Sequence, residues 1–195
     1  MTTEPLSSEL VIKTAAMIAD DEGIDALTLT TVAKRLGTSQ PALYRHVESY
    51  DDLIRSLGLQ GREMLAQRLT ESAVGVARED AVRAVGLAWR KMVAEHPGLY
   101  AATDRYPCAG DPELEAAVDR VIRTLQMSLA GFDLSEDQEV HVARTMRSAF
   151  HGFSHLEAGD GHPLEQDLDD SFDQLIELLC RGIRAAGLDT AGGRD

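Results

Sequence analysis

The side chains with the clearest chemical potential lie between residues 28 and 50 of this 195-residue chain. Most carry hydroxyl, amide or cationic groups that can hydrogen-bond to phosphate oxygens or to the edges of bases, and small side chains can contact a thymine methyl group. The candidates for contact with double-stranded DNA are Thr28, Thr30, Lys34, Thr38, Ser39, Gln40, Pro41, Ala42, Tyr44, Arg45, His46 and Tyr50.

The charge of this stretch differs from that of the whole chain. With 33 acidic and 19 basic residues, the chain has a formal net charge of −14, counting His as neutral. Residues 26–47 contain no Asp or Glu, and Lys34, Arg35 and Arg45 give them +3. The rest of the chain therefore carries −17, the difference between −14 and +3. Because an acidic body repels phosphates, we expect any nucleic-acid contact to be confined to this window.

Two short helices are expected to position these side chains. Residues 30–36 and 40–47 have helical periodicity, and Gly37 separates them. Ser39 is a good N-cap and Pro41 fits the first turn of the second helix. So tight a connection forces the helices to cross at a large angle, which predicts a helix-turn-helix whose second helix enters the DNA major groove. The apolar positions that would close its core are Val32, Ala33, Leu36, Leu43 and Val47.

The remainder of the chain also has helical periodicity, and no stretch alternates as a strand does. The other expected helices cover residues 8–22, 49–69, 79–95, 111–130, 135–157 and 168–186. The predicted fold is therefore all-α, with an N-terminal three-helix helix-turn-helix domain over residues 1–55. A larger helical domain is expected over residues 56–195.

One run of residues resembles a known family. Leu43-Tyr44-Arg45-His46-Val47, followed by Asp51-Asp52-Leu53, is similar to the end of the helix-turn-helix in the TetR family of bacterial transcriptional regulators. The resemblance covers about residues 8–55. Family members usually have Phe at Val47 and Lys at Tyr50. A tyrosine hydroxyl can replace the phosphate contact of that lysine, with the loss of one charge per half-site.

The resemblance implies a ligand-released repressor that binds a palindromic operator as a homodimer. It also implies a pocket for a small-molecule effector in the second domain, where 89, 96–100 and 151–153 look like one C-terminal type of the family. The bulky candidates for lining that pocket are Trp89, Met92, Tyr100, Tyr106, Met127, Met146, Phe150 and His151. Ordinary core packing is the alternative interpretation of each of them.

A narrow apolar seam on the last helix predicts the dimer interface. Its residues recur at helical spacing, as expected of the core of a four-helix bundle formed by two helices from each subunit. The expected interface residues are Phe153, Phe172, Leu175, Ile176, Leu179 and Ile183.

Two competing classes of function remain open at this stage. The net charge of −14 favours a helical protein-interaction module that binds no DNA. His141, His151 and His155 on one helix allow a small metal-binding enzyme, but Arg144 in the same sector opposes a dication. We find no catalytic or cofactor-binding motif, so the expectation is a non-enzyme without metal or cofactor.

The expected location is the cytoplasm, without membrane association. No apolar run is long enough to span a bilayer, and the first residues lack the pattern of a signal peptide. In that setting Cys108 and Cys180 are expected to be reduced thiols.

Overall fold

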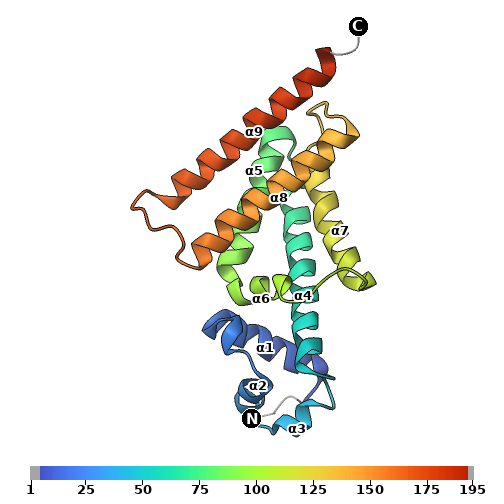
Figure 1. Ribbon diagram of the computed structural model, residues 1–195, viewed down its shortest axis with the longest axis vertical. Helices are drawn as coiled ribbons and strands as arrows, with labels where there is room; N and C mark the ends of the chain where they lie inside the picture. Colours follow the sequence, from blue (N-terminus) through green and yellow to red (C-terminus); the bar gives the residue numbers. More distant parts are fainter. Residues whose placement is uncertain (1–4, 193–195) are drawn as a thin grey trace. The chain divides into compact units, whose positions relative to one another are not determined.

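The computed structural model describes residues 5–192, with side chains to residue 188, and every regular element in that part of the chain is a helix (Figure 1). The chain divides into two compact units. The N-terminal unit comprises Met1–Met64 together with Glu95–Ala117, and the C-terminal unit comprises Leu65–Ala94 together with Val118–Asp195. The all-α fold class is as predicted.

The N-terminal unit is built mainly from short helices. In chain order its complete helices are α1 (Ser8–Glu22), η1 (Ile24–Ala26), α2 (Leu29–Arg35), α3 (Gln40–Leu43), α6 (Pro97–Ala101) and η2 (Ala102–Asp104). It shares α4 (Tyr50–Ser72) and α7 (Pro112–Met127) with the C-terminal unit, which also contains α5 (Arg78–Glu95), α8 (Glu136–Ala158) and α9 (Leu168–Gly192).

Local capping explains where the first helices begin and end. The Ser7 hydroxyl accepts a hydrogen bond from the Leu10 N–H at 3.1 Å, and Gly23 ends α1 with φ = 88°, a backbone conformation that favours glycine. Thr28 and Thr31 form a reciprocal capping box at the start of α2. These side chains bond N–H groups that lack partners within the helix.

Several of the observed elements differ from the expected ones. Helix α3 ends at Leu43 rather than near 47, because the next residues form a turn in which the His46 N–H bonds the Leu43 carbonyl at 2.8 Å. Helices η1, α6 and η2 were not expected, since three to five residues are too few to show periodicity. The compact N-terminal unit continues to Met64 and includes Glu95–Ala117.

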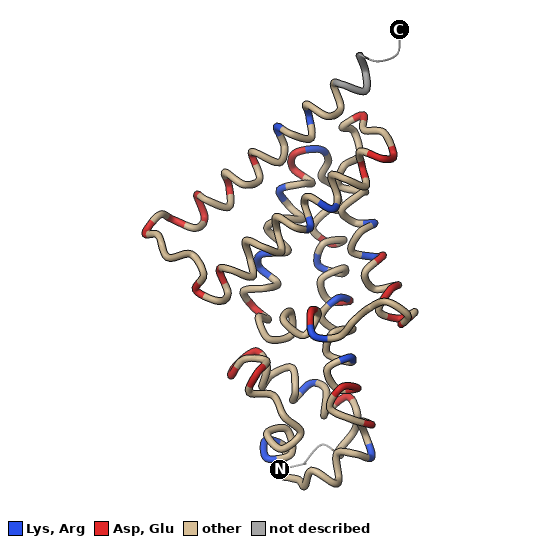
Figure 2. The backbone as a smooth tube through the Cα atoms, in the orientation of Figure 1, with Lys and Arg blue, Asp and Glu red and all other residues tan. Residues whose placement is uncertain are grey.

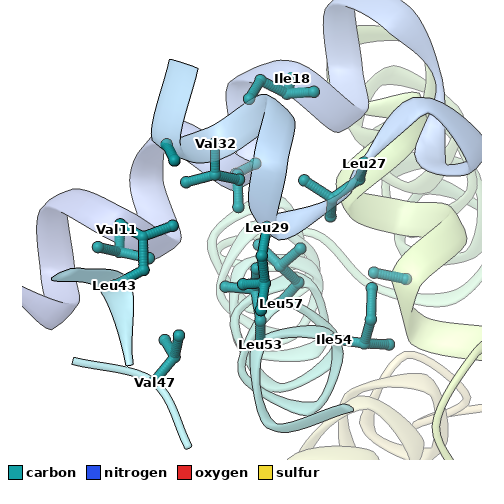
Figure 3. Close-up of a cluster of buried hydrophobic side chains, with 14 of the residues drawn as sticks. Val11, Ile18, Leu27, Leu29, Val32, Leu43, Val47, Leu53, Ile54 and Leu57 are labelled. Carbon is teal, nitrogen blue, oxygen red and sulfur yellow. The ribbon is translucent and has the colours of Figure 1, made fainter. Parts of the chain in front are cut away.

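Aliphatic side chains fill the core of the N-terminal unit (Figure 3). Val11 and Ile18 of α1 pack with Val32 of α2, Leu43 of α3 and residues of α4. No aromatic side chain belongs to the buried part of this cluster, and Tyr106 packs against it while partly exposed. Small and branched side chains let short helices approach closely, which suits a tight helix-turn-helix.

Helix α6 is held against the end of α1. The Asp20 carboxylate accepts hydrogen bonds from the Leu99 N–H at 2.8 Å and from His96 Nδ1 at 2.9 Å. A Cβ at Gly98 would overlap the carbonyl oxygen of Ala19, so only glycine permits this approach of the two backbones. Residues far apart in sequence are thereby joined within one unit.

Aromatic side chains dominate the core of the C-terminal unit. The Phe150 ring lies 6.3 Å from Trp89 and 6.1 Å from Phe172, in tilted arrangements. Gly86 on α5 leaves the space that the Phe150 ring occupies. Arg90 binds Glu157 through two hydrogen bonds of 2.6 and 2.7 Å, and it lies over the Phe172 ring.

Helices α8 and α9 pack on each other in this unit. Ser135 and Gln138 cap α8 reciprocally, and the Gln138 amide also donates to the Ala186 carbonyl at 3.0 Å. Within residues 5–192, none of the helices has the length and apolar character needed to cross a bilayer.

Candidate nucleic-acid interface

The twelve residues predicted to contact DNA all belong to the N-terminal unit, and none is buried. Exposed side chains belong to Thr28, Thr30, Lys34, Ser39, Pro41, Tyr44, Arg45 and Tyr50, and partly exposed ones to Thr38, Gln40, Ala42 and His46. The apolar residues between them, such as Val32 and Leu43, are buried in the core. The helices therefore separate a polar face from an apolar one, as the sequence predicted.

The turn between α2 and α3 fixes how this face is presented. Gly37 adopts φ = 65°, and its neighbour Thr38 donates its N–H to the Ala33 carbonyl at 3.0 Å. Across the turn, the Thr30 hydroxyl lies 3.3 Å from Oε1 of Gln40 and can donate to it. Thr30 thus orients the amide of the first residue of α3.

The end of the helix-turn-helix is hydrogen-bonded to α1. The Ser8 hydroxyl donates to the carbonyl oxygen of His46 at 2.9 Å, while Tyr44 and Arg45 lie exposed in the turn between them. Helix α4 then begins with the Ser49 hydroxyl accepting the Asp52 N–H, and the Asp52 carboxylate accepting the Glu48 N–H, each at 3.0 Å. These two side chains bond N–H groups that precede or begin α4.

Not all the positive charge of residues 26–47 is available to a ligand in the folded protein, because one of the cations is paired. Arg35 pairs with Glu22 at 2.5 Å and lies 3.7 Å from Asp21, so two acids of α1 compensate it. Lys34 and Arg45 form no ion pair within the described part of the chain. Figure 2 shows blue but no red along α2. Two lysine or arginine side chains are therefore available to phosphates, rather than three.

Tyr50 lies in a more acidic setting than the positions before it. Burial is the main cause that raises the pKa of its hydroxyl, Asp25 and Asp51 raise it further, and Arg105 opposes them. Arg105 is itself paired with Asp25 at 2.6 Å. The hydroxyl stays protonated at neutral pH and can donate a hydrogen bond, which is the role expected where other members have lysine.

The residues predicted to line an effector pocket are divided between the units. Trp89, Met92, Met146 and Phe150 are buried core residues of the C-terminal unit, as the alternative interpretation held. Tyr100 is buried and Tyr106 partly buried in the N-terminal unit.

The two remaining pocket candidates are at least partly exposed. Met127 is 70% exposed, so the interpretation of this residue as a pocket or core residue is wrong. It is the last residue of α7, where helical periodicity does not define the inner face. His151 is partly exposed and stacks on His155, with ring centroids 5.7 Å apart.

A groove of about 580 Å³ lies on the N-terminal unit, between α1 and α4. None of the predicted ligand residues lines it. Its lining consists of Glu9, Ile12, Lys13, Ser56, Leu59, Gln60 and Glu63. No motif in the sequence indicated this groove, because its residues come from two helices whose packing had to be known first.

The seam predicted as a dimer interface is only partly exposed. Phe172, Ile176 and Ile183 are buried within the C-terminal unit, so these three are core residues of the subunit. Phe153, Leu175 and Leu179 are partly exposed. Helical spacing identifies an apolar face, but it cannot tell whether the same chain or a second copy covers it.

The structure also bears on the metal and cysteine hypotheses. Among the described residues, no group of three or more His, Cys, Asp or Glu side chains could hold a metal ion. Cys108 and Cys180 are both free thiols.

Comparison with known proteins decides the family. A family model described as "Bacterial regulatory proteins, tetR family" matches residues 11–57, and a second, "Tetracyclin repressor-like, C-terminal domain", matches residues 82–179. The HTH-type transcriptional regulator Rv0681 of Mycobacterium tuberculosis is 35% identical over 179 residues, which cover 91% of this chain and 82% of the relative. The chain belongs to the TetR family of bacterial transcriptional regulators.

Further TetR-family relatives match most of the chain. The HTH-type regulator YobS of Bacillus subtilis is 25% identical over 91% of this chain and 93% of its own. The solved TetR-family regulator SCO7222 of Streptomyces coelicolor has a TM-score of 0.69 and 22% identity, covering 94% of this chain and 100% of its own. A TetR variant of Acinetobacter baumannii in complex with minocycline has the same TM-score and identity, covering 93% and 98%. The two solved structures share the fold.

Proposed function

We propose that this TetR-family protein binds a palindromic operator as a homodimer and represses transcription until a small molecule releases it. The observation that carries the proposal is the exposed, acid-free face of α2 and α3 in a chain of net charge −14. A protein that bound only other proteins would have no need to exclude acids from this one stretch. The site of action is the bacterial cytoplasm, where the operator is.

Different residues of this face serve different purposes. Gln40, oriented by Thr30, is placed at the start of α3 to hydrogen-bond a base edge, and Ala42 is small enough to sit beside a thymine methyl group. Tyr44, Arg45 and His46, together with Lys34 and Tyr50, contact phosphates. With only two unpaired cations per half-site, sequence-independent affinity is low, and selectivity depends on α3.

The exposed surface of α8 and α9 supplies the dimer contact. Leu178 is 64% exposed on α9, one turn from Gly182, where an added Cβ would meet no atom within 4 Å. Gly152 on α8 is equally open, and Leu156 is exposed on the next turn. Exposed leucines beside glycines allow two helix pairs to approach closely in a four-helix bundle. Leu175 and Leu179 complete the expected face.

A ligand releases the dimer from DNA by shifting it from an operator-binding arrangement to one that cannot bind the operator. A small molecule that binds the operator-incompetent arrangement more tightly draws the dimer away from DNA by its differential affinity. The Acinetobacter relative was solved with minocycline bound, which supports small-molecule control as the mode of regulation here.

Selection of bound DNA from a random pool tests the proposal directly. We expect a palindrome whose half-site centres lie about one helical turn, or a multiple of it, apart. Gln40→Ala should relax the preference at one position of each half-site, whereas Tyr44→Phe should weaken all sequences alike. Enrichment of no sequence, at low salt as well as at physiological salt, would contradict operator binding.

Substitution on the α8–α9 face tests the dimer. Leu178→Asp should yield a monomer in sedimentation and lower operator affinity by about 100-fold or more, because the two half-sites are no longer linked. Leu164→Asp is the matched control, since Leu164 is also an exposed leucine but lies in the loop before α9. A Leu178→Asp protein that remains dimeric would refute this interface.

A further inference from the structure

The buried arginine of the N-terminal unit has no anionic partner. Arg62 on α4 is only 7% exposed, and no other arginine of the described chain is classed as buried. No carboxylate of a described residue forms an ion pair with it. Placing a cation in a protein interior without a counter-charge costs several kcal/mol.

The other two poorly exposed arginines show what this protein does elsewhere. Arg90, with 15% of its side chain exposed, pairs with Glu157 and Asp169. Arg55, at 25%, pairs with Asp111 and Glu113. The chain thus supplies two carboxylates to each of these two arginines, which are less buried than Arg62, and none to Arg62 itself.

The guanidinium of Arg62 is held in place by one hydrogen bond, but one of its terminal nitrogens has no hydrogen-bond partner. Its Nη2 donates to the carbonyl oxygen of Thr103, which fixes the plane of the group. Its Nη1 is buried and has no hydrogen-bond partner. Leaving a charged donor unpaired in the interior is costly, so a partner for Nη1 is expected.

Glycine at position 58 makes room for Nη1 beside α4. A Cβ at Gly58, one turn before Arg62, would lie 2.9 Å from Nη1 and 3.1 Å from the Ala102 carbonyl oxygen. Gly61 similarly admits the Leu99 carbonyl, which a Cβ would meet at 2.8 Å. Two apolar residues of this region, Leu99 and Ala102, are buried in the core to which α4 contributes.

We propose that Arg62 binds the carboxylate of a small organic acid with an apolar body, and that this acid is the effector. The assignment of the acid as effector rests on the ligand-released function proposed above. The positive charge and the free Nη1 donor select an anion, and the apolar surroundings select a hydrocarbon body. Because the Thr103 carbonyl oxygen already accepts from the same guanidinium, a monoanion is favoured over a dianion such as phosphate.

Thermal unfolding of the full-length protein tests the binding step without DNA. The probes are straight-chain carboxylates from acetate to decanoate and benzoate, each compared with its primary alcohol or benzamide and with sodium chloride at equal ionic strength. We expect at least one carboxylate to raise Tm by about 5 °C near saturation, while its neutral counterpart and chloride do not. If none of these acids raises Tm beyond its neutral counterpart, the proposal is wrong.

Three variants locate the effect. Arg62→Gln should lower the affinity for the acid at least tenfold. Gly58→Ala should do the same while keeping the charge, because its methyl group takes the space beside Nη1. Arg55→Gln is the control, since it removes an arginine that already has partners, and the acid should still raise Tm. Equal shifts in all three variants would overturn the assignment to Arg62.

A DNA-binding measurement separates this inference from the proposed function. Using the selected operator, we expect the acid that raises Tm to release the wild-type protein but not Arg62→Gln. Operator binding that is insensitive to an acid bound at Arg62 would refute the effector assignment alone. Binding of the acid by a protein that selects no DNA would refute the proposed function and leave the anion site standing.

Discussion

The two units of this regulator build their interiors from different side chains. The cluster of the N-terminal unit is aliphatic, whereas all four phenylalanines and the single tryptophan of the chain lie in the C-terminal unit. Close-packed small side chains hold short helices in fixed relation, as the presentation of a few polar residues to DNA requires. Large rings fill the wider spaces between long helices. The short helices of this protein are therefore joined by aliphatic side chains, and its long helices by aromatic ones.

The largest expected effect tests the aromatic interior. Phe150→Ala removes a fully buried ring that contacts Trp89 and Phe172, and it should lower the free energy of unfolding by about 4 kcal/mol. Urea denaturation followed by circular dichroism measures the loss in either unit, because both units are helical. Val32→Ala in the aliphatic interior should cost less, about 2 kcal/mol, since it removes fewer atoms. If both variants lost the same free energy of unfolding, the proposed difference between the two interiors would be wrong.

A glycine in the N-terminal unit should be nearly as sensitive. Gly98→Ala places a methyl group onto the Ala19 carbonyl, and the forced separation of α6 from α1 should cost about 3 kcal/mol. Gly159→Ala in the C-terminal unit is the control, because its nearest contact would be an ordinary 3.5 Å, and the change should stay within about 0.5 kcal/mol. Denaturation curves give the free energy of unfolding of each variant. Similar stability of both variants would contradict the close packing of α6 on α1.

The ion pairs of the N-terminal unit predict a pH dependence. The hydrogen bond from Arg55 is the main cause that lowers the pKa of Asp111 below its ordinary value. A lowered pKa in the folded state stabilises the fold above the unfolded value, near pH 4, and this contribution is lost as pH falls through the folded pKa. Asp111→Asn should therefore be less stable than wild type at pH 7, with a difference that shrinks toward pH 3. A constant difference in Tm across this range would count against the pair.

The smallest expected effect is a difference between the alkylation rates of the two cysteines. It compares how well each unit protects its thiol from reagent. Cys108 is partly exposed in the N-terminal unit, whereas Cys180 is buried in the C-terminal unit, and burial is the main cause that raises the pKa of its thiol. Because the thiolate is the reactive form, iodoacetamide at neutral pH should label Cys108 first. Cys180 should react only as fast as its unit unfolds, and Phe150→Ala should accelerate it. Mass spectrometry of timed samples gives both rates; equal rates would show that the units do not differ in protection.

The sequence predicted most where structure depends on neighbours in the chain. Ser39 and Pro41 lie at the start of α3 as expected, because the signals that start a helix act over three or four residues. The polar face of α2 and α3 was predicted for the same reason, since the composition of one short window defines it.

Contacts between distant segments could not be predicted in this way. Asp20 is 79 residues from Leu99, and Arg62 is 41 from Thr103, so no local pattern indicates either contact. Phe172 and Ile176 have the spacing of an apolar face, yet only the packing of α8 on α9 shows that their own chain buries them. The family resemblance supplied the fold of these segments but not their contacts.

The contact of α6 with α1 has a consequence for how the protein is made. The N-terminal unit needs residues 95–117, which follow thirty residues of the other unit, Leu65–Ala94. During synthesis, α1 to α3 therefore leave the ribosome well before the segment that supplies the partners of Asp20 and covers part of their apolar surface. A fragment that ends at residue 64 would lack Leu99 and Ala102 from its core. The helix-turn-helix of this protein is thus local in sequence, but the unit that supports it is completed late in translation.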